Sequence, residues 1–391
     1  MWNVIGIING SLADEVVIIG NHRDAWIAGG AGDPNSGSAA LNEVIRSFGA
    51  ALAHGWKPLR TLVFASWDGE EYGLIGSTEW VEEYLPWLSK TAVAYLNVDV
   101  GTVGPYFKAS AAPLLNKALI ETTHLVLSPN QTVPGQTVGD VWNKHISTMG
   151  SGSDFTAFQD YAGIPCVDMG FQGGPDTPVY HYHSNYDSAS WMDAFGDPGF
   201  HYHATVARLW ALLAARIAET PVVQFNATDY ADGLMRYLEA VEEKAMRNST
   251  IFAEEGASGS EHRFKHLEAA LHRLHNASAA LDARAAALTK DIRDNPLPWW
   301  KWWEKVKLHF KLRAINDRYK YLERQFLYAQ GLDGRPWFKH VVFAPGLWTG
   351  YAGATFPGLV ESVERGDKGG VRRWAGIITG LVDKAAGSLE E

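Results

Sequence analysis

The chain has 391 residues, of which 46% are hydrophobic and 20% are charged. These proportions are typical of a globular protein, and the length allows two domains. The 34 basic residues are outnumbered by 44 acidic ones, and the net charge of -10 argues against a nucleic-acid partner. No apolar run is long enough to cross a membrane.

The single cysteine excludes an intrachain disulfide and a zinc site built from thiolates. Alone, this scarcity favours a reducing compartment. Five N-x-[ST] triplets instead favour a glycoprotein of the secretory pathway, and they begin at Asn9, Asn130, Asn226, Asn248 and Asn276. Residues 1–10 lack the basic start of a secretory signal and resemble a strand entering a turn. We therefore expect the chain to be part of a longer protein.

Short apolar runs alternate with helical patterns in the first half of the chain. The predicted strands are 16–20, 61–66, 92–98 and 164–169, and the predicted helices are 38–53, 74–85 and 200–218. This alternation predicts an α/β fold with a mainly parallel sheet flanked by helices.

The second half is mostly helical, with a change in composition near residue 220. Apolar residues recur three and four apart in 234–246, 261–288 and 303–327, and a final helix is expected at 372–381. We predict domains at 1–220 and 221–391, the second an α-helical bundle. The tryptophans at 299, 300, 302 and 303 are expected in its core or in an interface, with a membrane-surface patch as the alternative.

Polar residues follow three of the predicted strands. His22 follows the first, Glu70 and Glu71 follow the second, and Asp99 follows the third. The carboxyl ends of parallel strands meet at one edge of a sheet, so these side chains are expected to lie together. Adjacent glutamates project differently, so one can bind a metal while the other faces a water on it. The residues alone leave open which glutamate has which role, and an isolated pair would equally suit a solvated turn.

Two loops add further ligands to this edge. The glycine-rich loop 29–37 bends sharply and presents Asp33, and the loop 180–187 contains His183. Nitrogen and oxygen ligands of this mixture suit zinc, and five of them fit two metals about 3.5–4 Å apart better than one. Asp24 is positioned to accept a hydrogen bond from the second ring nitrogen of His22. The other histidines, including His181, His201 and His203, are interpreted as packing or surface residues.

Five motifs resemble peptidase family M28, specifically the branch of glutamate carboxypeptidase II, prostate-specific membrane antigen and the transferrin receptors. They are His22-Arg23-Asp24, Asp33-Pro34-x-Ser36-Gly37, Ser66-Trp67-Asp68-x-Glu70-Glu71, Asn97-x-Asp99 and Tyr182-His183-Ser184. The resemblance runs from residue 4 to the end of the chain. It implies a co-catalytic dizinc exopeptidase with two Zn²⁺ per chain and a peptide substrate.

The resemblance also implies a role for each residue. Asp33 would bridge the zinc ions, which His22, Asp99, Glu71 and His183 would also hold. The remaining residues that it implies are Glu70 as general base, Tyr182 as oxyanion donor, Gly152, Ser153 and Tyr351 as substrate contacts, and Glu79 and Glu82 as part of a structural Ca²⁺ site. An exposed helical face explains those two glutamates equally well.

The family further implies a homodimer formed through the helical domain and a loop at about 340–358 that returns to the active site. It implies an upstream protease-associated domain, absent here, and a membrane-anchored parent whose catalytic domain is lumenal, vacuolar or extracellular.

Two departures concern substrate specificity. The lysine that the family places before Tyr351 is Gly350 here, and the segment 166–171 has Asp168 where arginines are expected. A neutral pocket does not compensate for the desolvation of a substrate carboxylate. We therefore expect hydrolysis of peptide bonds, carboxypeptidase-like as in the related branch, whereas these residues do not specify the release of glutamate. The alternatives are an aminopeptidase of the same family and a noncatalytic receptor-like relative, against which the intact ligand set argues.

Overall fold

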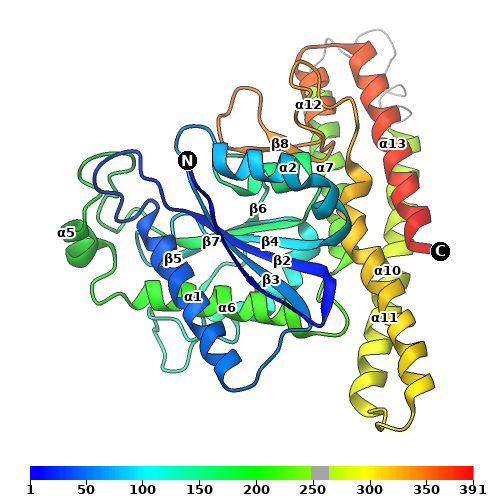
Figure 1. The fold of residues 1–391 in the computed structure, drawn as a ribbon. Coiled ribbons are helices and arrows are strands. Elements are labelled where there is room, and N and C mark those ends of the chain that lie inside the picture. Colours follow the sequence, from blue (N-terminus) through cyan, green and yellow to red (C-terminus); the bar gives the residue numbers. More distant parts are fainter. Residues whose placement is uncertain (248–263, 391) are drawn as a thin grey trace. The chain divides into compact units, whose positions relative to one another are not determined.

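The computed structural model describes residues 1–247 and 264–390, which form two compact units (Figure 1). Unit 1 contains residues 1–147, 152–158 and 164–220. Unit 2 contains residues 148–151 and 159–163 together with the described chain from residue 221 onward. The sequon at Asn248 lies outside the described residues.

Unit 1 is built on a seven-stranded sheet with the order β1-β3-β2-β4-β7-β5-β6. Its strands are β1 (Val4–Ile8), β2 (Leu12–His22), β3 (Arg60–Trp67), β4 (Ala92–Asn97), β5 (Tyr106–Ala111), β6 (Ile146–Ser147) and β7 (Cys166–Gln172). The central pairs β3–β2, β2–β4 and β4–β7 are parallel, whereas β1–β3 and β5–β7 are antiparallel. The predicted mainly parallel sheet is therefore confirmed. Strands β5 and β6, at the β6 end of the sheet, were not predicted.

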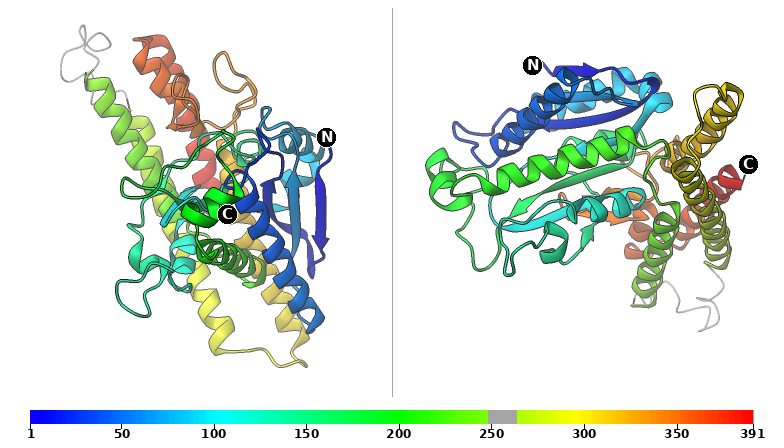
Figure 2. Two further views of the ribbon diagram at one scale, coloured as in Figure 1. Left: turned by 90° about the vertical axis from the view of Figure 1, so that its left-hand side faces the viewer. Right: turned by 90° about the horizontal axis from the view of Figure 1, so that it is seen from below.

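Helices cover both faces of this sheet (Figures 1 and 2). The long ones are α1 (Asn35–Ala53), α2 (Ile75–Thr91) and α6 (His201–Glu219), and the short ones are α3 (Asn116–Thr123), α4 (Val138–Val141) and α5 (Ala189–Trp191). The chain steps from β2 to β3 through α1, then back past β2 to β4 through α2. Right-handed crossovers in opposite directions place α1 and α2 on opposite faces. Helix α6 packs beside α1.

The middle of the sheet is buried on both faces, as its continuous apolar runs require. All four residues from Val16 to Ile19 are inaccessible to solvent. At Gly20 a Cβ atom would lie 2.5 Å from the Tyr95 hydroxyl and 2.7 Å from the Trp67 indole nitrogen. The missing side chain leaves room for the 2.9 Å hydrogen bond from Trp67 to Tyr95. Strands β2, β3 and β4 consequently stay close where they end.

Unit 2 is mainly helical and contains α7 (Ala227–Arg247), α10 (Lys265–Asp294), α11 (Trp302–Leu322), α12 (Pro357–Glu364) and α13 (Lys368–Glu390). Helix α10 packs against α7 and α13 through buried leucines three to seven residues apart, such as Leu267, Leu271, Leu274 and Leu281. A small hairpin, β8 (Phe343–Pro345) and β9 (Gly353–Thr355), occupies part of the segment expected to be loop. No helix in the described ranges has the length and hydropathy needed to span a bilayer.

A buried polar network lies inside unit 2, centred on Glu323. One oxygen of this inaccessible carboxylate accepts hydrogen bonds from Gln159 at 2.6 Å, Tyr230 at 2.9 Å and His340 at 2.9 Å. The other ring nitrogen of His340 accepts two backbone N–H groups, so the proton is on the nitrogen facing Glu323. The side chains of Gln159, Tyr230 and His340 are buried beside this carboxylate, so their donors depend on it as a hydrogen-bond acceptor.

Candidate metal centre

Three neighbouring strands deliver polar side chains to one edge of the sheet. His22 is the last residue of β2, Glu70 follows the end of β3 by three residues, and Asp99 follows the end of β4 by two. The order β3-β2-β4 makes this edge the point where the chain reverses direction across the sheet. Open α/β sheets bind ligands at such a point.

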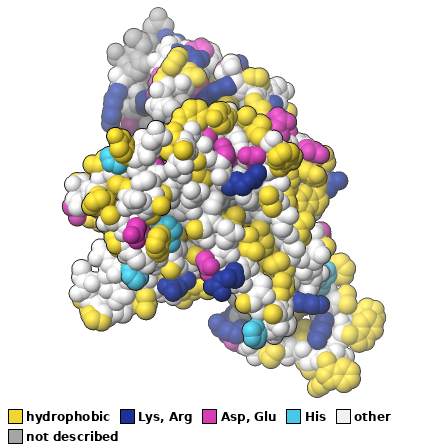
Figure 3. All heavy atoms as spheres, turned by 60° about the vertical axis from the view of Figure 1, so that its left-hand side comes forward, with side chains coloured by type: hydrophobic (Ala, Val, Ile, Leu, Met, Phe, Trp, Pro, Cys, Tyr) yellow, Lys and Arg dark blue, Asp and Glu magenta, His cyan; other side chains and the backbone are white. Residues whose placement is uncertain are grey.

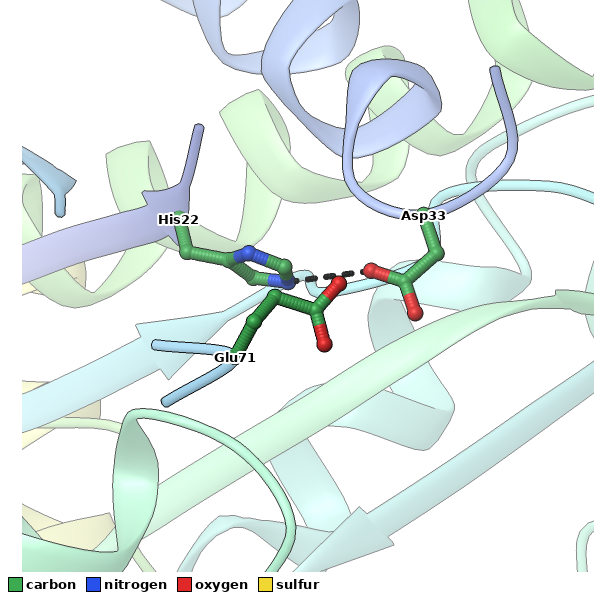
Figure 4. A group of neighbouring side chains, drawn as sticks. All are labelled: His22, Asp33 and Glu71. Atoms are coloured by element: carbon green, nitrogen blue, oxygen red, sulfur yellow. Dashed lines mark ion pairs between the residues drawn. The ribbon is translucent and has the colours of Figure 1, made fainter. Parts of the chain in front are cut away.

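Asp33 lies between two histidines. Its Oδ1 atom is 3.3 Å from Nε2 of His22, and its Oδ2 atom is 3.3 Å from Nε2 of His183. Figure 4 shows His22, Asp33 and Glu71 converging on one another. Nε2 of His22 is also 2.9 Å from Oδ1 of Asp99, and Nε2 of His183 is 3.0 Å from Oε2 of Glu71. Each oxygen of Asp33 thus faces its own set of nitrogen and carboxylate ligands.

Two groups of three ligand atoms lie within 4.8 Å of one another in the described part of the chain. One consists of His22, Asp33 and Glu71, and the other of His22, Glu70 and Asp99. The adjacent glutamates therefore belong to different groups. Geometry alone makes either one a candidate ligand, so the roles of Glu70 and Glu71 still depend on the family resemblance.

The site concentrates buried negative charge that the protein does not neutralise. The ion pairs of Asp33, Glu71 and Asp99 all go to the two histidines, and no lysine or arginine among the described residues joins them. Oδ1 of Asp33 is buried without a hydrogen bond. Buried carboxylates of this density are stable only when paired with cations or protonated. The donor set and its unpaired oxygen therefore fit divalent metal ions.

The pKa values of the site residues reflect the same deficit of positive charge when no metal is bound. Burial, with a further contribution from Asp99, raises the pKa of Glu70 to about 10. Burial also raises the pKa of Asp33. Burial would lower the pKa of His22, but the negative charge of Asp99 and the close approach of the Asp24, Asp33 and Asp99 carboxylates raise it overall. Without metal the site retains protons that a bound cation would displace.

Asp24 has a different contact from the one expected. Nδ1 of His22 lies 3.0 Å from the backbone carbonyl of Asp24 and 3.8 Å from its carboxylate, so the carbonyl is the nearer acceptor. The Asp24 carboxylate instead accepts the backbone N–H groups of Glu70 at 3.0 Å and Glu71 at 3.2 Å. It thereby fixes the turn that carries both glutamates.

Asp187, whose role was not predicted, shapes the Asp33 loop. Its buried carboxylate accepts the N–H groups of Gly32 at 2.7 Å and Asp33 at 3.1 Å, and the Tyr180 hydroxyl at 3.0 Å. Asp187 ends the histidine-rich loop, far from Asp33 in the sequence. The only available signal was its position four residues after His183.

A second group with an unpredicted positioning role lies behind Asp99. The side-chain amide of Asn97 donates to Ser153 at 2.9 Å and to Asp168 at 2.9 Å, and Ser153 hydrogen-bonds the Asp99 carboxylate. Ser153, expected to contact substrate, is buried, and its hydroxyl positions Asp99. Asp154 is also buried here, and burial raises the pKa of its carboxyl to about 7.

The remaining predicted site residues have varied settings. The exposed Tyr182 stacks on His183 with ring centroids 3.7 Å apart, and Gly152 adopts a positive φ of 96° beside Ser153. Tyr351 belongs to unit 2 and is exposed. Glu79 and Glu82 are exposed on α2, and within the described ranges neither belongs to a group of three metal ligands.

The other histidines singled out in the sequence lie outside both ligand groups of the described chain. His203 pairs with Asp197 at 2.7 Å, and His181 contacts the ring of Tyr186. These contacts agree with packing roles.

Comparison with known proteins identifies the class to which this fold and site belong. Residues 3–196 match peptidase family M28, and residues 262–390 match the transferrin receptor-like dimerisation domain. The chain therefore belongs to peptidase family M28 and carries the metallopeptidase domain of that family, as the motifs predicted.

The relatives place it in the glutamate carboxypeptidase-like branch. It is 42% identical over 394 residues to a probable glutamate carboxypeptidase of Arthroderma benhamiae, covering 100% of this chain and 51% of the relative. It is 32% identical over 399 residues to the aminopeptidase NAALADL1 of Rattus norvegicus, covering 96% of this chain and 50% of the relative. The chain thus spans about half the length of these curated relatives.

A solved structure, a zinc aminopeptidase from Bacillus subtilis, is 21% identical with a TM-score of 0.40. That match covers 55% of this chain and 48% of the other.

Proposed function

We propose that the protein is a co-catalytic dizinc exopeptidase that hydrolyses peptide bonds. The observation that supports this most is the position of Asp33, with one carboxylate oxygen toward His22 and the other toward His183. A carboxylate shared in this way suits a pair of metal ions. His22 and Asp99 would hold one zinc and His183 and Glu71 the other, with Asp33 between them.

The bound zinc ions would supply an acidified water and polarise the scissile carbonyl. Glu70, buried beside His22 and Asp99, takes a proton from the attacking water and passes it to the leaving amine. Tyr182, next to His183, donates a hydrogen bond to the oxygen that becomes negative as the carbonyl is attacked. Asp24, Asp187 and Ser153 hold the surrounding loops and ligands in place.

Carboxypeptidase-like activity is the first candidate because of the 42% identical relative. Aminopeptidase activity is the second, and the charge of the site favours it. Asp168 stands where the family has an arginine, and its carboxylate is held by Asn97 near Asp99. A substrate ammonium suits such an acidic edge better than a carboxylate does. A noncatalytic receptor-like role is disfavoured because every ligand is present.

Metal analysis combined with blocked dipeptides tests these alternatives on the full-length parent protein. We expect about two zinc ions per chain and hydrolysis of N-blocked dipeptides that have a free carboxylate. Hydrolysis only of C-blocked dipeptides would identify an aminopeptidase. Bound zinc without turnover of either series would contradict the enzymatic proposal.

Several finer features remain part of this proposal. The dimerisation domain supports a homodimer, and the half-length match supports an upstream domain in the parent. We place the parent in the secretory pathway, membrane-anchored with its catalytic domain lumenal, vacuolar or extracellular.

Asn9 and Asn130 are exposed and suit glycosylation, whereas Ser278 of the Asn276 sequon is buried inside α10. Calcium binding near Glu79 and Glu82 rests on the family alone.

A further inference from the structure

The hairpin formed by the end of α10 and the start of α11 extends beyond the core of unit 2. The last buried residue of α10 is Ala285, and the first buried residue of α11 is Asn316. No residue between them is buried. Figure 1 shows this hairpin, in yellow, continuing past the end of α13. Residues 286–315, here called the projecting hairpin, therefore contribute a surface and no core.

Large aromatic side chains gather on this exposed segment. The exposed fractions are 81% for Trp299, 63% for Trp300, 55% for Trp302, 63% for Trp303 and 66% for Phe310. The structure thus excludes the core position expected for these tryptophans. Exposed apolar clusters of this kind mark contact surfaces. Trp302 and Trp303 stack with centroids 3.9 Å apart, so they present one continuous aromatic face.

The same surface is positively charged although the protein is acidic. Residues 299–313 contain five cations, Lys301, Lys305, Lys307, Lys311 and Arg313, and one acid, Glu304. Lys301 pairs with that glutamate at 3.2 Å. Lys305, Lys307 and Lys311 are exposed, and no carboxylate of the described chain lies within ion-pair distance of them. Figure 3 shows hydrophobic side chains and lysine or arginine side chains together in this region.

A groove of about 770 Å³ between the two arms combines both properties. Leucines such as Leu297 and Leu308 line it beside Lys301, Lys305 and Lys311. Asp291 and Glu304 also line the groove, but the four lysines leave its lining net positive, so an occupant with apolar and anionic parts fits it best.

We propose that the projecting hairpin binds the surface of an anionic lipid bilayer, independently of catalysis. Tryptophan rings settle at the boundary between headgroups and acyl chains, and lysines are attracted to anionic headgroups. A two-fold contact of this hairpin with the hairpin of a second copy would bring two cationic surfaces together, which disfavours that particular arrangement. Surface binding requires no membrane-spanning helix.

Vesicle flotation with the whole chain tests the proposal, using phosphatidylcholine vesicles with or without phosphatidylglycerol. We expect binding only to the anionic vesicles, with a blue shift in tryptophan emission. Trp302→Ser with Trp303→Ser, and separately Lys305→Glu, Lys307→Glu and Lys311→Glu together, should each weaken binding at least about tenfold. The matched controls are Trp2→Ser with Trp348→Ser, and Lys57→Glu, Lys117→Glu and Lys144→Glu, at exposed sites outside the hairpin.

Thermal unfolding verifies that each variant is folded, and sedimentation reports its oligomeric state. Equal binding by hairpin and control variants would overturn the proposal, as would no binding to anionic vesicles. Conversion of a dimer to a monomer by the hairpin variants, without vesicle binding, would assign this surface to contact between copies. None of these results depends on peptidase activity.

Discussion

The carboxylate of Asp187 holds the backbone of Asp33 in place, with the Asp33 N–H donating to Oδ2 at 3.1 Å. The other carboxylate oxygen accepts the neighbouring N–H of Gly32 at 2.7 Å. The loop that carries the central candidate ligand is therefore fixed by a residue 154 positions further along the chain. Hydrogen bonds that orient metal ligands in this way contribute to metal affinity.

Asp187→Asn should reduce zinc affinity by about 10- to 100-fold, because an amide keeps only one of the two acceptor oxygens. Competition with a chromogenic chelator measures this affinity. Asp176→Asn is the control, since that exposed carboxylate contacts only the Tyr106 hydroxyl among the contacts described. Equal zinc affinity in the two variants would show that the Asp187 contact is dispensable.

Glu70→Gln should abolish turnover while the chain still binds about two zinc ions, because the change removes the proton acceptor and keeps the metal ligands. Glu71→Gln should instead reduce the zinc content. Zinc per chain and hydrolysis rate are measured for both variants. The opposite pattern would exchange the roles of the two glutamates.

The metal-free protein should lose stability as pH rises from about 5 to about 10. In this window the Glu70 carboxyl, with its pKa raised from 4.5 to about 10, keeps its proton when folded and releases it when unfolded. Fewer protons bound in the unfolded state mean that the free energy of unfolding falls with pH. Thermal unfolding of chelator-treated protein across this range measures the slope.

Glu70→Gln provides the internal comparison for that slope, because glutamine does not titrate. The metal-free variant should show a weaker dependence on pH than the parent chain. Identical slopes would mean that Glu70 does not hold the proton.

Gly37→Ala should destabilise unit 1 by about 1–3 kcal/mol, because a Cβ atom there would lie 2.1 Å from the backbone oxygen of Asp99. Gly49→Ala in the same helix meets nothing within 4 Å and should stabilise by about 0.5–1 kcal/mol. Chemical denaturation measures both. Destabilisation by both changes would show that the close approach at Gly37 is not the cause.

Glu323→Ala should cost about 3–5 kcal/mol of folding free energy, because it leaves the Gln159, Tyr230 and His340 donors buried without an acceptor. Tyr230→Phe removes only one donor from the same network and should cost about 1 kcal/mol. Urea denaturation distinguishes these two magnitudes. A cost for Glu323→Ala no larger than for Tyr230→Phe would argue against the network.

The sequence by itself determined the central part of unit 1 and the candidate ligands at its strand ends. Continuous apolar runs at 16–20, 61–66 and 92–98 require burial on both faces, which only strands inside a covered sheet provide. Polar residues follow each run, so the predicted parallel strands place His22, Glu70, Glu71 and Asp99 at one edge of the sheet. Strand β5 was missed because its antiparallel pairing with β7 is a long-range contact without a local signal.

Tertiary structure alone decided which distant groups support that site and which aromatic residues stay exposed. The sequence gives no sign that Asp187 supports Asp33 or that Asn97 and Ser153 support Asp99, because these hydrogen bonds depend on how strands and loops come together. The tryptophans of 299–303 have a composition typical of a core, and only the end of core packing at Ala285 and Asn316 leaves them exposed. Composition states how apolar a segment is, whereas burial depends on whether another element packs against it.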